Sequence, residues 1–98
     1  MNILTFPVFY IRMSRENRYQ IFLPGEALLP EEALRRIKGV ASLRHVPEQG
    51  VLFLTLDERR EEDAAEILRE AVTLIRRAGG EVRTKKTTCP VLHMACAA

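Results

Sequence analysis

The sequence predicts one α+β domain in which two helices cover one face of a four-stranded antiparallel sheet. The chain has 98 residues, which is enough for a single domain. Its 47% apolar and 29% charged residues are ordinary values for a globular protein. Between Arg18 and Lys86 the predicted order is strand, helix, strand, strand, helix, strand. Each helix then joins strands that are not hairpin neighbours, which is the ferredoxin-like βαββαβ arrangement.

The chain begins with a predicted β-hairpin. The segment Thr5–Met13 is rich in aromatic and β-branched residues, and Arg18–Leu23 alternates apolar with polar positions. The polar stretch Ser14–Asn17 between them predicts a four-residue loop. Since the second strand already belongs to the four-stranded order, residues 1–17 are expected to be an extension that adds an extra strand at the edge of the sheet.

The remaining elements follow from apolar spacing and from residues that begin or end helices. Pro30 and the glutamates after it predict a short helix that ends at Lys38-Gly39. Asp63, with Glu66 three residues later, predicts the start of a longer helix that ends at Gly79-Gly80. Strands are expected at Val40–Val46, Val51–Asp57 and Glu81–Lys86, and the second of these is expected to be central because it is almost continuously apolar.

The framework of residues 18–86 resembles the heavy-metal-associated domain, a module of copper chaperones and of heavy-metal-transporting P-type ATPases. The resemblance is carried by Leu34-x-x-Ile37-x-Gly39-Val40-x-x-Leu43, then a glycine turn, an apolar strand and a helix rich in Ala and Glu. Members of this family hold Cu(I) or Zn(II) with a Gly-Met-Thr-Cys-x-x-Cys loop, and the corresponding Leu23–Leu29 contains no cysteine. An alignment that starts at Thr5 also leaves the motif without cysteine. The resemblance therefore implies a degenerate metal site.

Residues 87–98 contain a cluster of soft metal ligands, including both cysteines of the chain. This tail resembles the opening strand and metal loop of a second such module, with Met94-Ala95-Cys96 on the Met-Thr-Cys of the motif. Candidate ligands for Cu(I) or Zn(II) are therefore Cys89, His93, Met94 and Cys96. An extended strand places the two thiols on opposite sides, so convergence on one ion requires either a turn after Leu92 or a second chain. The alternative is a chain end whose thiols bind no metal.

Composition and motifs exclude several functional classes. There is no catalytic constellation, and no apolar run is long enough to span a membrane. A net charge of +2 does not indicate nucleic acid or a membrane surface as the partner. His45 is expected to be a half-buried strand residue. The aromatic residues are interpreted as core, since the glycine-aromatic signature of RNA-binding sheets is absent; they are Phe6, Phe9, Tyr10, Tyr19, Phe22 and Phe53.

The resemblance implies a cytoplasmic, non-catalytic interaction module at the N-terminus of a metal-exporting P-type ATPase. Its expected partners are neighbouring ATPase domains or a metallochaperone, and the 98 residues are expected to be a fragment that ends just inside a second module. The alternative is a free-standing ferredoxin-like protein that acts by forming a homodimer through the exposed edge of Thr5–Met13.

Overall fold

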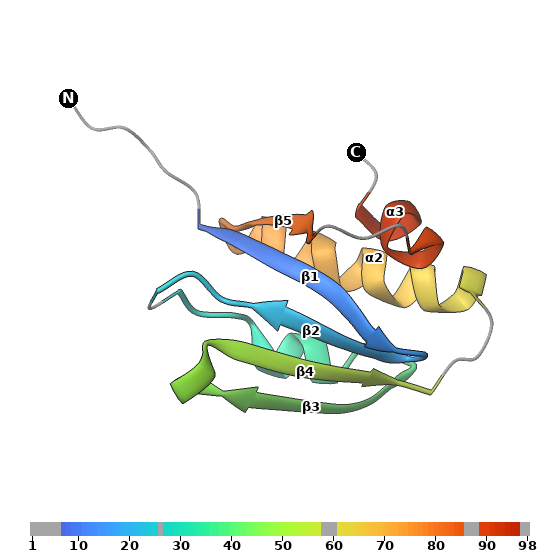
Figure 1. The fold of residues 1–98 in the computed structure, drawn as a ribbon, viewed down its shortest axis with the longest axis horizontal. Coiled ribbons are helices and arrows are strands. Elements are labelled where there is room, and N and C mark those ends of the chain that lie inside the picture. Colours follow the sequence, from blue (N-terminus) through green and yellow to red (C-terminus); the bar gives the residue numbers. More distant parts are fainter. Residues whose placement is uncertain (1–6, 26, 58–60, 86–88, 97–98) are drawn as a thin grey trace.

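The computed structural model describes residues 7–25, 27–57, 61–85 and 89–96 as a five-stranded mixed sheet with three α-helices (Figure 1). The strand order is β3-β4-β2-β1-β5. The strands are β1 (Val8–Arg15), β2 (Arg18–Phe22), β3 (Val40–Val46), β4 (Val51–Leu56) and β5 (Glu81–Thr84). The helices are α1 (Glu31–Arg35), α2 (Glu61–Arg77) and α3 (Pro90–Cys96), and a 3₁₀ turn, η1 (Pro47–Gln49), joins β3 to β4.

The core lies between the helices and one face of the sheet (Figure 1). Alternate residues of the strands point into it, among them Ile21 of β2 and Leu52 and Leu54 of β4. Helix α2 contributes a stripe at helical spacing that includes Leu68 and Ile75. Both elements are therefore where the sequence predicts them, and β4 lies inside the sheet between β3 and β2. Helix α2 begins earlier than expected, at Glu61, and α1 ends earlier than expected, at Arg35.

Strand β1 lies inside the sheet, and its predicted position at an edge is wrong. It pairs antiparallel with β2, where Ile11 lies opposite Ile21, and parallel with β5, where Phe9 lies opposite Val82. Phe9 and Ile11 are each only 1% exposed, so this strand needs neighbours on both sides to bury them. The order therefore differs from the ferredoxin-like one, in which the last strand would pair with residues 18–23. The homodimer that the sequence suggests would therefore not find a free edge along Val8–Ile11, where β5 pairs with β1.

The hairpin between β1 and β2 is tighter than predicted. Strand β1 continues to Arg15, and only Glu16 and Asn17 form the turn. Asn17 has a φ of 62°, a left-handed conformation that asparagine tolerates well in two-residue hairpin turns. An irregularity between Met13 and Arg15 shifts the register just before the turn. The predicted four-residue loop is wrong because the polar residues Ser14 and Arg15 belong to the strand.

The C-terminal tail forms a helix, so the predicted opening strand is wrong. Residues 90–96 are α3, which contacts α2, β5 and β1. Its buried residues are Val91, Leu92 and Ala95. Leu92 and Ala95 follow Val91 by one and four positions, which places all three on one side of a helix. In a strand they would be divided between two faces. The apolar residues of the tail thus follow the helical period and extend the core of this domain.

Candidate functional site

The predicted metal ligands lie on or next to α3, but the helix separates the two thiols. Cys89 and Cys96 are seven positions apart, which corresponds to about 10 Å along a helix axis. Two thiolates on one zinc ion lie within about 4.6 Å of each other, since each Zn–S bond is about 2.3 Å. Cys89 is buried with its Sγ 3.6 Å from Sδ of Met13. In the described part of the chain, no group of three or more His, Cys, Asp or Glu side chains is placed to hold a metal.

Two of the predicted ligands, His93 and Cys96, share a surface feature. Both line an open groove of about 520 Å³ beside β5, together with Arg76, Glu81 and Arg83. Met94 is 37% exposed, and its carbonyl oxygen accepts a hydrogen bond from Arg69. Burial raises the pKa of the Cys96 thiol, although the nearby Arg76 opposes this. Because the thiolate is the form that binds metal, the raised pKa disfavours metal capture by Cys96 at neutral pH.

His45 is half-buried, as the sequence predicts, and it connects two elements. Its Nδ1 lies 2.9 Å from Oε1 of Glu31, the first residue of α1. This contact attaches the start of the helix to β3, which suits a structural role.

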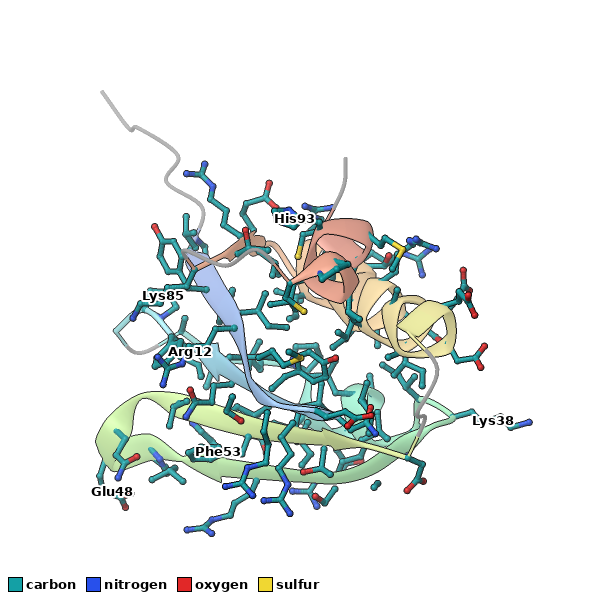
Figure 2. All side chains as sticks on the ribbon, turned by 45° about the vertical axis from the view of Figure 1, so that its right-hand side comes forward. Arg12, Lys38, Glu48, Phe53, Lys85 and His93 are labelled. Carbon is teal, nitrogen blue, oxygen red and sulfur yellow. The ribbon has the colours of Figure 1, made fainter. Side chains whose placement is uncertain are left out.

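The opposite face of the sheet has a different composition and is turned away from the helices (Figure 2). Cross-strand partners point to the same side of a sheet, so the strand registers define rows of side chains across it. We call these residues the open face. Its middle row is Arg44, Phe53, Gln20 and Arg12; the rows on either side of it are Val46, Val51, Phe22 and Tyr10, and Ser42, Thr55, Arg18 and Arg15.

The open face is cationic. Strands β1, β2, β3 and β4 contain no Asp or Glu, and they carry Arg12, Arg15, Arg18 and Arg44. Within the described residues, none of these four arginines forms a salt bridge. Seven of the acidic residues lie instead on α1 and α2, namely Glu31, Glu32, Glu61, Glu62, Asp63, Glu66 and Glu70. The small net charge of the chain therefore conceals a separation of charge between the two sides of the domain.

The two phenylalanines of the open face have different surroundings. Two cations lie over the ring of Phe22: Lys85 Nζ is 4.3 Å and Arg12 Cζ is 5.5 Å from its centroid. Arg12 Nε also donates a hydrogen bond to Oε1 of Gln20, which fixes its position. Phe53, by contrast, lines an open hollow of about 540 Å³. The polar lining of this hollow comprises Arg15, Arg18, Arg44, Ser14, Ser42, Thr55 and Gln49.

The aromatic interpretation is correct for two of the five described residues. Phe9 and Tyr19 are core residues, Phe6 lies outside the described residues, and the other three aromatic residues belong to the open face. Tyr10 is 42% exposed, and Phe53 is half-buried. The signal that distinguishes them is strand alternation: Phe53 stands between Leu52 and Leu54, which point into the core, so it must point the other way.

The carboxylate at the start of β5 makes folding stability depend on pH. Arg76 Nε donates to Oε1 of Glu81 at 2.7 Å, the Val82 N–H donates to the same oxygen at 2.8 Å, and both bonds lower the pKa of Glu81. Because the pKa is lower in the folded state, the ionised carboxylate of Glu81 stabilises the fold at pH values above the ordinary glutamate pKa of about 4.3. This stabilisation is lost as the pH falls through the lower pKa of the folded state. We expect Glu81→Gln to flatten the acid limb of stability against pH, measured by urea unfolding.

A second variant tests whether the hydrogen bond from Arg76 causes this pH dependence. Arg76→Gln removes the main hydrogen-bond donor and leaves the carboxylate, so its acid limb is expected to flatten in the same way. Stability profiles that stay parallel to the wild type in both variants would refute this role for the pair.

Within the described ranges, no helix is long and apolar enough to cross a membrane. No protein-family model gives a match to this chain, and no curated protein or solved structure matches it significantly. The heavy-metal-associated resemblance and the transport role that it implies therefore stay predictions. What the structure establishes is an α+β domain with a five-stranded mixed sheet, three helices and a cationic, partly aromatic open face.

Proposed function

We propose that this domain is a non-catalytic binding module that holds single-stranded nucleic acid on the open face of its sheet. One observation carries the proposal: Phe53 lies in a hollow with Arg15, Arg18 and Arg44 around it, on strands that contain no carboxylate. The module would use the aromatic rings for bases and the arginines for phosphates.

The physical basis is the combination of flat aromatic rings, which stack on bases, with guanidinium groups, which bind phosphates. An aromatic side chain that stacks on a base contributes about 1–3 kcal/mol. A guanidinium group binds phosphate through two parallel hydrogen bonds, and its charge attracts the backbone at long range. Phe53 and Tyr10 are two strands and about two residues apart, which corresponds to about 12 Å. Two bases can therefore stack on separate rings, with Gln20 and Phe22 of β2 between them.

The aromatic rings favour an unpaired strand over other polyanions. In a duplex the flat faces of the bases are hidden by their neighbours, so Phe53 and Tyr10 would find no stacking partner there. An acidic protein would match the arginines and leave the same two rings unused. A single strand is the ligand that satisfies both kinds of side chain.

This proposal departs from the expectation based on net charge. The value of +2 averages the acidic helices with the basic strands, so it does not describe the surface that a ligand meets. The role in metal export implied by the family resemblance is a separate proposal. The groove that contains His93 and Cys96 is where a Cu(I) titration would test it.

The test is fluorescence anisotropy with a labelled, unstructured RNA oligonucleotide. We expect saturable binding that weakens with salt, with a slope of about −0.7 in log affinity against log salt for each phosphate contacted. Phe53→Ala is expected to weaken binding by about 5- to 150-fold, which corresponds to the loss of one stacked base. Leu28→Ala is the matched control, because Leu28 is 87% exposed and lies outside the open face.

Two results would contradict the proposal. One is a wild-type protein that shows no saturable binding at low salt. The other is a Phe53→Ala variant that remains folded and binds RNA as tightly as the wild type while polyglutamate competes equally well. That second result would mark the open face as an electrostatic surface for an acidic protein.

A further inference from the structure

The hollow over Phe53 presents mainly hydrogen-bond donors. Arginine has five N–H donors and no acceptor, and three arginines line this hollow. The lining also contains the hydroxyl residues Ser14, Ser42 and Thr55, the amide of Gln49 and the buried Tyr19. Ser14 already donates its proton to the carbonyl oxygen of Arg18. None of the described lining residues is a carboxylate, so the charged groups that they contribute are all arginine donors. Such a lining favours a base edge that consists of acceptors.

Guanine has that edge. Its O6 and N7 are adjacent acceptors, whereas adenine places an N6 donor next to N7 and cytosine presents an N4 donor. Uracil has isolated carbonyl acceptors beside its N3–H donor. The guanidinium fork of arginine spans O6 and N7 with two hydrogen bonds, and this is the commonest specific contact between proteins and bases in DNA.

The strand register identifies which arginine is best placed. Arg44 lies directly opposite Phe53 in the β3–β4 pair, so their Cβ atoms are about 5 Å apart. Arg18 lies opposite Thr55, in the next row, and is therefore a diagonal neighbour at about 7–8 Å. Arg12 is already bonded to Gln20 and lies over Phe22. Arg44 is exposed and is the arginine beside the edge of a base stacked on Phe53.

From this arrangement we infer that the Phe53 hollow selects guanine, with Arg44 binding O6 and N7 of the stacked base. The inference rests on the proposed function and names the base that this site prefers. Arg15 and Arg18, which are cross-strand partners in the neighbouring row, then contact the phosphates of the bound strand. Since wrong bases would bring a donor against the donors of Arg44, the expected preference is about tenfold to a hundredfold over adenine.

The experiment compares single-stranded RNAs that differ only at a central base in a uridine background. We expect the guanine oligonucleotide to bind tightest, inosine to bind nearly as well because it keeps O6 and N7, and 7-deazaguanine to bind like adenine because it lacks N7. The Arg44→Lys variant keeps the positive charge but loses the pair of N–H donors that binds O6 and N7 together. It is expected to bind the adenine oligonucleotide almost normally and to lose the guanine preference.

Arg36→Lys is the matched control, because Arg36 is an exposed arginine next to α1 and away from the open face. It is expected to keep both the affinity and the preference of the wild type. Equal binding of all four oligonucleotides would overturn the guanine inference and leave the proposed function standing. A preference that survives Arg44→Lys would overturn the assignment to Arg44. Failure of every oligonucleotide to bind would overturn the proposed function itself.

Discussion

Reversing two arginines of the open face, Arg18→Glu together with Arg44→Glu, is expected to weaken binding of single-stranded RNA by at least about 100-fold. Both residues line the hollow that contains Phe53, and the change replaces two cations with two carboxylates. The variant loses two phosphate or base contacts and gains repulsion from the backbone, and both effects act in the same direction. Anisotropy titrations at near-physiological salt measure the loss.

The fold is expected to survive this reversal. Arg18 and Arg44 are exposed and form no salt bridge within the described residues, so the free energy of unfolding is expected to change by less than about 1 kcal/mol. The control is Arg36→Glu with Arg77→Glu, which changes the net charge equally at exposed positions beside α1 and on α2. If the control loses as much affinity as the open-face variant, binding depends on total charge and the site assignment fails.

Ile11→Ala is expected to lower the free energy of unfolding by about 2–5 kcal/mol. The Ile11 side chain is 1% exposed on the core face of β1, opposite Ile21 on one neighbouring strand and Thr84 on the other. Truncation leaves a cavity between sheet and helices, and that cavity adds to the lost burial of apolar surface. Urea unfolding followed by circular dichroism measures the change.

Arg12→Ala provides the comparison at the next residue of the same strand. Arg12 belongs to the open face, so its truncation is expected to cost less than about 1 kcal/mol. If Ile11→Ala were as mild as Arg12→Ala, the place of β1 inside the sheet would be contradicted, and the edge position that the sequence predicts would be favoured.

Local sequence patterns predicted individual strands and helices better than they predicted which strands pair. The continuous apolar run of β4 and the helical stripe of α2 each require a specific kind of burial, so both elements were predicted correctly. Strand β1 was misplaced because an apolar strand fits next to β2 whether or not another strand covers its far side. The pairing with β5 involves residues that are more than 70 positions away, and no local pattern records it.

The tail and the open face escaped prediction for related reasons. The strand expected in the tail came from the resemblance to the opening of a second module. The spacing of the buried residues Val91, Leu92 and Ala95, which is helical, was not weighed against it. The rows of the open face depend on register, because Arg44 becomes a neighbour of Phe53 only through the β3–β4 pairing. Composition averaged the charges of both faces and therefore concealed the basic one.

The most direct test of RNA binding on the open face is an amide NMR titration of the wild-type protein with a guanine-containing single-stranded RNA. We predict saturable shifts in the strands at Ser42, Arg44, Phe53 and Arg18, with α2 and α3 unaffected. Shifts confined to those two helices, or spectra that do not change at saturating RNA, would contradict it.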